Sequence, residues 1–366
     1  MPFYTYNDIM IVPATSTTIK SRSECNPFKN NGKLPIFTAP MSTVVDEESF
    51  QRFEDNNINA ILPRNIKLET RLEYAKDSKW AAFSLKEFED FFCDINSINS
   101  DEDKPWKVLI DVANGHMVQI YDLVKQSKHI HGRKNITIMV GNIANPDTYQ
   151  LCYNSGVDYV RCGIGAGRGC TSSTYVGIHY PMASLIRDIF SIKNAIFKHD
   201  NIKQLSWEEM PQIICDGGID TYSKVIKALA LGADYVMIGK LFASCIESAD
   251  GFYVLTKNGI EEKVDYQTAL DLYIRGEESL YKEFYGMASY EGQLAINGEV
   301  SKVPEGKCLS IGIDKSLKTW VKNMIAYLRS AMSYCDSYSL DTFNPKFVRT
   351  IYISSATQKS INPAIE

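Results

Sequence analysis

The sequence lacks paired cysteines and any apolar run long enough to cross a membrane. None of the nine cysteines among its 366 residues forms a Cys-x-x-Cys pair, which argues against a zinc site or a disulfide framework and favours free thiols in a reducing compartment. No apolar run reaches the ~18 residues of a membrane span. The first residues, Met1-Pro2-Phe3-Tyr4, lack the basic and apolar regions of a secretory signal. We therefore expect a cytoplasmic protein that does not bind membranes.

The chain also lacks an excess of positive charge. The chain has 39 Lys and Arg against 44 Asp and Glu, a net charge of -5, so no general electrostatic attraction favours nucleic acid. An anionic small molecule would need a local binding site. The length allows one large barrel or two ordinary domains.

Eight short apolar runs recur before residue 240, separated by segments long enough for a helix. Continuous apolar runs of this length suit parallel strands that are covered on both faces. We predict strands at 35–38, 58–62, 80–84, 106–112, 136–140, 157–161, 212–215 and 234–238, and helices at 47–56, 117–128, 147–155 and 222–231. Eight such units in order predict an α/β protein with a (β/α)8 TIM barrel.

The pattern changes after the eighth strand. Residues 250–313 carry eight glycines and mixed charges, which predicts a long glycine-rich excursion over the active face, an active-site flap region with only a short helix near 266–274. Helical spacing over 317–334 predicts a closing barrel helix, and the tail from Asp336 is expected to be peripheral. We treat residues 1–366 as a single catalytic barrel domain without an inserted regulatory domain.

A loop after the predicted sixth strand holds four glycines in seven positions and then Cys170. Glycine is favoured where the backbone turns sharply or approaches a ligand. The loop is either a glycine-rich turn with a buried cysteine or the site of a nucleophilic thiol. Its place on the active face of the barrel favours the nucleophile.

Two further glycine turns follow the last two predicted strands. Asp216-Gly217-Gly218 and Gly239-Lys240 lie where barrels commonly hold a phosphate, although both could be tight turns without a ligand. Asp216 would repel phosphate but could accept hydrogen bonds from a ribose diol. Together they predict a nucleoside monophosphate, whose purine C2 could be attacked by Cys170 while Ser172 transfers a proton.

These residues resemble the inosine monophosphate dehydrogenase and guanosine monophosphate reductase family. The resemblance runs from about residue 6 to 335, through the segments PIFTAPMSTV, GIGAGRGCTSS, DGGI, KALALGADYVMIGKLFA, FYGM and VPEGK. It implies a (β/α)8 barrel in which Cys170 is the nucleophile and Glu305 lies near the base. It also implies a homo-oligomer, commonly a tetramer.

The reductase is the better match of the two activities. The dehydrogenase carries an Arg-Tyr pair on its flap to hydrolyse the covalent intermediate, whereas residues 290–304 contain no arginine. The segments DVANG, FYGM and EGK resemble the reductase, and the chain between Phe83 and Trp106 is too short for a regulatory insertion. We predict an NADPH-dependent conversion of guanosine monophosphate, or a close analogue, to inosine monophosphate and ammonia through a Cys170 thioimidate. The alternatives are an NAD-dependent inosine monophosphate dehydrogenase without regulatory domains and a catalytically silent purine-nucleotide-binding homologue.

The predicted site residues fall into four groups. The catalytic residues are Cys170, Ser172 and Glu305. The substrate-binding residues are Ser42, Gly169, Asp216, Gly217, Gly218, Gly239, Lys240, Tyr285, Gly286, Met287 and Gly306. The cofactor-binding residues are Asp111, Ala113, Asn114, Gly163 and Gly165. Backbone carbonyls of Gly163, Gly165 and Cys170 would hold a K+ ion.

Overall fold

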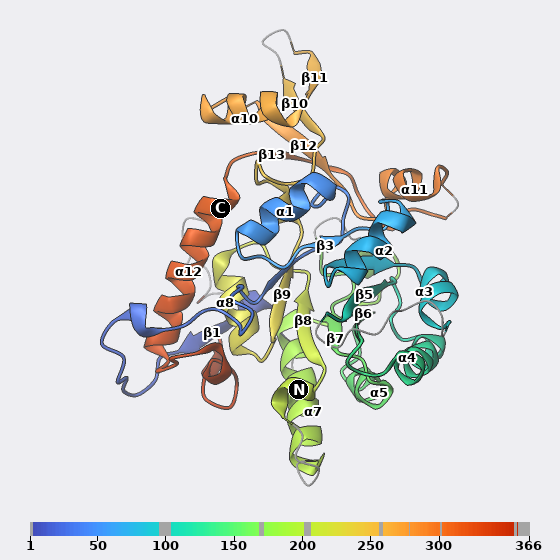
Figure 1. Ribbon diagram of the computed structural model, residues 1–366. Helices are drawn as coiled ribbons and strands as arrows, with labels where there is room; N and C mark the ends of the chain where they lie inside the picture. Colours follow the sequence, from blue (N-terminus) through green and yellow to red (C-terminus); the bar gives the residue numbers. More distant parts are fainter. Residues whose placement is uncertain are drawn as a thin grey trace.

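The core of the molecule is a ring of eight parallel strands surrounded by helices (Figure 1). The computed structural model describes residues 3–94, 104–167, 172–200, 206–255, 259–277, 279–300, 302–354 and 357. The ring consists of β2 (Ile36–Thr38), β3 (Ile61–Leu62), β4 (Trp80–Phe83), β5 (Trp106–Asp111), β6 (Ile136–Ile143), β7 (Tyr159–Cys162), β8 (Gln212–Asp216) and β9 (Tyr235–Ile238). The predicted (β/α)8 TIM barrel is therefore confirmed.

The strands follow one another around the ring in chain order, and the last of them, β9, pairs with the first, β2. The ring closes between β2 and β3 through a parallel bridge from Phe37 to Asn59. The Asn59 N–H donates to the Ile36 carbonyl at 3.0 Å, and the Thr38 N–H donates to the Asn59 carbonyl at 2.9 Å. The segment before β3 thus pairs with β2 through an isolated bridge, and the observed β3 is shorter than the predicted strand.

Helices cover the outside of the barrel. They are α1 (Glu47–Asp55), α2 (Leu68–Lys76), α3 (Leu85–Phe92), α4 (Val118–His131), α5 (Thr148–Ser155), α7 (Met182–Asp200), α8 (Tyr222–Ala230) and α12 (Leu317–Tyr334). Some of them start after a side-chain cap: Asp46 accepts the Ser49 N–H at 2.7 Å before α1, and Ser84 accepts the Glu87 N–H at 3.2 Å before α3. Among the described residues, none of the helices combines the length and apolarity that crossing a bilayer requires.

Large side chains fill the interior of the ring. Phe37 and Trp80 meet edge to face with ring centroids 5.9 Å apart, and both are almost fully buried with Met139 and Met237. The barrel centre is thus a packed core rather than a channel. Any ligand site must lie at an end of the strands.

The excursion after β9 contains more regular structure than we predicted. It holds β10 (Phe252–Leu255), β11 (Glu261–Val264), α10 (Tyr266–Ile274), β12 (Leu280–Phe284), α11 (Tyr290–Asn297) and β13 (Leu309–Gly312). The expected helix is present, but the expectation of no other regular structure was wrong. Four of these elements form an antiparallel sheet in the order β11-β10-β12-β13, which stands above the barrel in Figure 1. The sheet was missed because its strands are only four or five residues long and two of them carry charges among their apolar positions.

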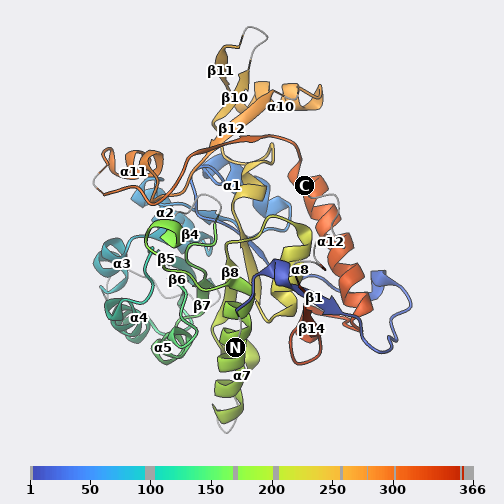
Figure 2. The same cartoon turned by 180° about the vertical axis from the view of Figure 1, so that it is seen from behind.

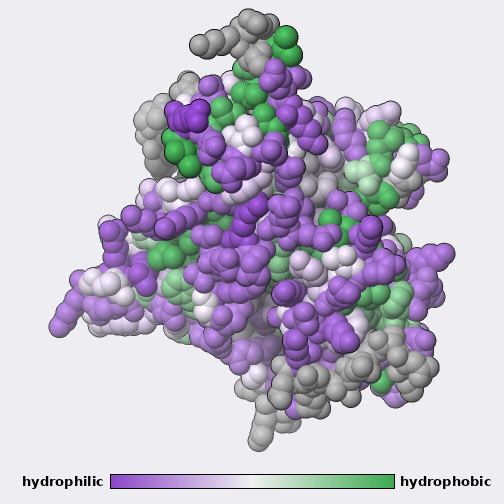
Figure 3. Space-filling model, turned by 45° about the horizontal axis from the view of Figure 1, so that its top comes forward, coloured by the Kyte–Doolittle hydropathy of each residue, from purple (hydrophilic) through white to green (hydrophobic). Residues whose placement is uncertain are grey.

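The excursion also exposes apolar side chains. Leu255, Ile260 and Ile274 are all more than two-fifths exposed, and apolar patches on this projecting part are visible in Figure 3. The remainder of that face is predominantly hydrophilic.

The two ends of the chain meet on the outside of the barrel. β1 (Ile9–Val12) pairs antiparallel with β14 (Arg349–Tyr352), with Ile9 opposite Tyr352, and Figure 2 shows the two strands side by side. Phe343 and Val348, in the tail, are buried in the main core. The tail is thus part of the packed structure rather than peripheral.

Candidate active site

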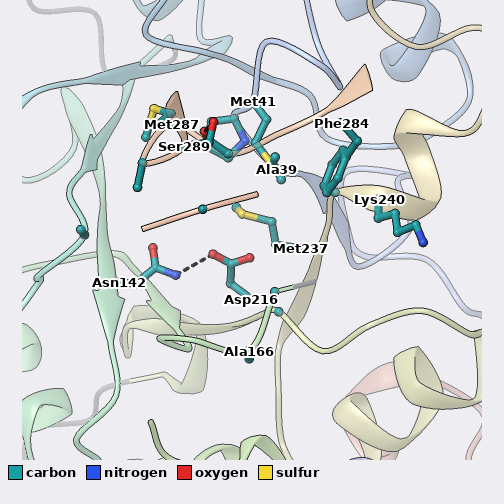
Figure 4. Close-up of a pocket in the computed structure, with 18 of the residues that line it drawn as sticks. Ala39, Met41, Asn142, Ala166, Asp216, Met237, Lys240, Phe284, Met287 and Ser289 are labelled. Atoms are coloured by element: carbon teal, nitrogen blue, oxygen red, sulfur yellow. Dashed lines mark hydrogen bonds between the residues drawn. The ribbon is translucent and has the colours of Figure 1, made fainter. Parts of the chain in front are cut away.

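A cavity of about 1340 Å³ opens at the carboxyl ends of the barrel strands and is roofed by the excursion (Figure 4). Twelve of the predicted site residues line it. They are Asp111, Ala113, Asn114, Asp216, Gly217, Gly218, Gly239, Lys240, Gly286, Met287, Glu305 and Gly306. The structure therefore brings Glu305 and most of the residues predicted to bind nucleotide and cofactor to one opening.

Other predicted residues lie beside this cavity or outside the described chain. Ser42 hydrogen-bonds the Tyr285 side chain; burial raises the pKa of Tyr285, and this hydrogen bond partly opposes the rise. Gly165 lines a smaller pocket of about 250 Å³ next to the main one. Ser172 begins the short helix α6 (Ser172–Tyr175), whereas Gly169 and Cys170 lie outside the described residues.

The floor of the cavity is organised by Arg161, which the sequence analysis did not identify. The Arg161 Nη1 donates to Asp111 Oδ1 at 2.6 Å, and its Nη2 donates to Asp216 Oδ2 at 2.8 Å. Although burial opposes the charge, the carboxylates of Asp216 and Asp111 raise the pKa of Arg161. The only sequence signal was a charged residue inside an otherwise apolar strand.

Asn142 is the second group that orients Asp216. The pairing of β6 with β7 shifts register between Gly141 and Ile143, and such irregularities redirect side chains. The Asn142 Nδ2 consequently donates to Asp216 Oδ2 and to the Gly163 carbonyl, both at 2.7 Å (Figure 4). The hydrogen bonds that Arg161 and Asn142 donate to Asp216 all arrive at its Oδ2. Among the described residues, its Oδ1 accepts none.

Glycine is required where this floor is tightest. A Cβ at Gly141 would lie 2.3 Å from the Arg161 Cβ, and a Cβ at Gly163 would lie 2.0 Å from the Asp216 carbonyl oxygen. Gly163 also has a φ of +141°, which side chains disfavour. These glycines allow β6, β7 and β8 to approach closely enough for the network to form.

Lysines are among the residues that line the cavity. Three of them are Lys224, Lys240 and Lys315. Lys224 pairs with Asp220 at 2.7 Å, and Lys315 pairs with Asp314. Among the described residues, Lys240 is the one of the three without a carboxylate partner.

Hydrogen bonds within the excursion hold the segment that roofs the cavity. The Ser289 Oγ donates to the Gly286 carbonyl at 2.8 Å and accepts the Gly292 N–H at 3.0 Å, which caps α11. A Cβ at Gly292 would lie 2.2 Å from the Gly286 carbonyl oxygen. The Glu305 N–H donates to the Ala288 carbonyl at 2.8 Å, so Glu305 is held beside this segment.

His116 fixes the loop after β5 that carries Ala113 and Asn114. Its Nε2 accepts the Ala144 N–H at 3.0 Å, and its Nδ1 lies 2.9 Å from the Thr148 Oγ1. Burial lowers the pKa of His116, in agreement with a neutral ring that accepts a backbone hydrogen bond. His116 therefore acts as a loop clamp.

Comparison with known proteins places these features in one family. Residues 3–363 match the IMP dehydrogenase / GMP reductase domain. The chain is 30% identical to a GMP reductase of Staphylococcus epidermidis over 361 residues, covering 95% of this chain and 97% of the relative. It is 28% and 27% identical to GMP reductases of Bacillus licheniformis and Bacillus subtilis, each over 347 residues and each covering 92% of this chain and 93% of the relative. These alignments span both the barrel and the excursion.

Proposed function

Since this chain belongs to the IMP dehydrogenase / GMP reductase family, we propose that it reduces GMP, or a close analogue, to IMP and ammonia with NADPH. It is a purine nucleotide oxidoreductase of GMP reductase type. The observation that carries the proposal is the cavity in which Asp216, held by Arg161, stands beside the glycine turns and faces the segment of Glu305.

The substrate is bound at three points in this proposal. The ribose diol donates to Asp216 Oδ1, the phosphate lies on the amides of Gly218 and Gly239, and Lys240 neutralises part of its charge. The purine then faces the segment of Met287 and Glu305 on the roof. A nucleoside monophosphate satisfies each of these groups without leaving the Lys240 charge unpaired.

Cys170 provides the nucleophile in this scheme. Its thiolate adds to C2 of the purine, Ser172 and Glu305 supply the proton with which the amino group departs as ammonia, and a thioimidate on Cys170 results. NADPH, when bound, supplies the hydride that replaces the sulfur at C2. Cys170 then leaves as a thiolate, which returns the enzyme to its starting state.

The residues present fit a nicotinamide cofactor. Asp111 Oδ2 and Arg64 Nε are buried and have no hydrogen-bond partner among the described residues, and both side chains line the cavity with Ala113 and Asn114. An acceptor and a donor left unpaired among the lining residues suit a carboxamide, which needs one of each. A K+ ion on the carbonyls of Gly163, Gly165 and Cys170 remains a prediction, as do a homotetramer and a cytoplasmic location.

The direct test is to mix the purified protein with GMP and NADPH and to follow the absorbance at 340 nm. We expect NADPH oxidation, and Glu305→Gln should lower turnover by roughly 10²-fold while leaving IMP affinity intact. No oxidation with any guanine nucleotide would overturn the proposal. Reduction of NAD with IMP would identify a dehydrogenase instead, and failure to trap any adduct on Cys170 by mass spectrometry would identify a silent binding protein.

A further inference from the structure

The segment that carries Glu305 lies at the cavity although its central side chain is exposed. It runs from Lys302 to Glu305, in the part of the excursion between α11 and β13, and Val303 is 86% exposed. Burial of this side chain therefore contributes little to the position of the segment. Lys302 and Glu305 nevertheless both line the cavity, which directs attention to the hydrogen bonds that hold them.

One buried side chain, Gln293 on α11, binds this segment through both ends of its amide group. The Gln293 Nε2 donates to the Lys302 carbonyl at 3.0 Å, and the Gln293 Oε1 accepts the Lys302 N–H at 3.0 Å. The side-chain amide thus exchanges two hydrogen bonds with one residue, as a paired residue of a neighbouring strand does. Gln293 is only 7% exposed, so water competes little for either bond.

The first turn of α11 holds the segment at a second point. The Gln293 N–H donates to the Ser289 carbonyl at 3.0 Å, which fixes Gln293 to the capped start of the helix. The residue before this cap, Ala288, accepts the Glu305 N–H at 2.8 Å. The start of α11 therefore binds the segment at Lys302 through a side chain and at Glu305 through the backbone.

Pro304 makes the connection between these two points stiff. It directly precedes Glu305 and follows Val303. The proline ring fixes its own φ, and it restricts the residue before it to extended conformations. A displacement of Lys302 is therefore passed on to Glu305 rather than absorbed by the two residues between them.

We propose that Gln293 is a positioning residue that holds Glu305 over the purine by pairing with the backbone of Lys302. The pairing is a property of the free chain. Its consequence for the reaction rests on the proposed function, in which Glu305 helps to supply the proton with which the amino group departs. The pairing involves no group assigned to the ribose or the phosphate, so its loss should lower turnover and leave nucleotide affinity unchanged.

Hydrogen–deuterium exchange on the free protein tests the pairing. Gln293→Met keeps a side chain of similar length but removes both hydrogen bonds, so the Lys302 amide should exchange about tenfold faster or more. Gln293→Glu should also accelerate it, because an ionised carboxylate can accept the Lys302 N–H but has nothing to donate to the Lys302 carbonyl. Gln267→Met makes the matched change at an exposed glutamine on α10 and should leave this exchange unchanged.

Steady-state kinetics test the positioning of Glu305. With GMP and NADPH, Gln293→Met should lower kcat by about tenfold or more, whereas IMP affinity should stay within about twofold of the wild type. A role in packing alone would leave kcat close to the wild-type value, because methionine fills similar space. A direct contact with the nucleotide would lower IMP affinity together with kcat. Gln267→Met should turn over like the wild type.

The proposal is overturned if exchange of the Lys302 amide is the same in Gln293→Met as in the wild type. It is also overturned if exchange accelerates while kcat is unchanged, or if IMP affinity falls as much as kcat. Should Gln293→Met fail to fold, exchange of the Lys302 amide in the wild type at the rate of an unprotected amide would exclude the pairing. A wild type that oxidises no NADPH with GMP would refute the proposed function, and the exchange results would still decide whether Gln293 holds the segment.

Discussion

Replacing Arg161 by methionine would remove the central cation of the cavity floor. The Arg161 side chain is 8% exposed, and its two partners, Asp111 and Asp216, are 3% and 16% exposed. Breaking a buried ion pair by removing one partner costs about 3–5 kcal/mol, because it leaves an uncompensated buried charge. Asp216 borders the cavity and can regain water, so most of this loss should come from Asp111.

The assay is denaturant unfolding of four proteins: the wild type, Arg161→Met, Asp111→Asn and the double variant. We expect Arg161→Met to lose about 3–5 kcal/mol and the double variant to recover part of that loss, because asparagine needs no counter-charge. Arg161→Lys should be intermediate, since a compact ammonium group cannot reproduce the planar guanidinium that reaches both carboxylates at once.

IMP affinity provides a second readout. Arg161→Met should bind the nucleotide at least about tenfold more weakly, which corresponds to about 1.4 kcal/mol, because Asp216 loses the group that directs Oδ1 toward the ribose. The guanidinium does not compensate these carboxylates if Arg161→Met unfolds at the same denaturant concentration as the wild type. The same conclusion follows if adding Asp111→Asn recovers none of the stability that Arg161→Met loses.

Three further perturbations probe separate parts of the site. The pKa of His116 is lowered in the folded protein, so the wild type should lose stability as the pH falls through about 6.5. In His116→Ala the melting temperature should change less between pH 7 and 5. An equal change of melting temperature in both proteins would contradict a neutral His116. Gly292→Ala places a Cβ 2.2 Å from a carbonyl oxygen and should weaken IMP binding by roughly tenfold or more, whereas Glu291→Ala on the same helix should bind like the wild type. Lys240→Met should weaken binding of IMP by about tenfold but leave inosine unaffected, and equal losses for both would show that Lys240 does not contact the phosphate.

Most of the barrel could be predicted because its strands are buried on both faces. Runs such as Val108-Leu109-Ile110 are apolar without interruption, and the observed β5 ends within one residue of the predicted strand. The excursion sheet gave no such signal. β11 consists of Glu261-Glu262-Lys263-Val264, and in β12 the apolar alternation is broken by Lys282, so pairing across the sheet, rather than local pattern, determines these strands.

The site was predictable where glycines and motif order mark the ends of strands, as at Asp216 and Gly239. Arg161 was not, because a charged residue in a strand gives no sign of which face it occupies or which carboxylates it meets. The direction of the Asn142 side chain depends on a register shift between β6 and β7. That shift is set by how the two strands pair and leaves no mark in the local sequence. The prediction for Cys170 lies outside the described residues and stays a prediction.

The pairing of β1 with β14 has a consequence for synthesis on the ribosome. Ile9–Val12 leaves the ribosome long before its partner Arg349–Tyr352 is made. At about 5–20 residues per second, the first strand waits on the order of tens of seconds for the second. During that interval an apolar edge strand has no partner and offers a template for other chains. The ring of β2 to β9 can close earlier, so this outer seam should be sealed after the ring has formed.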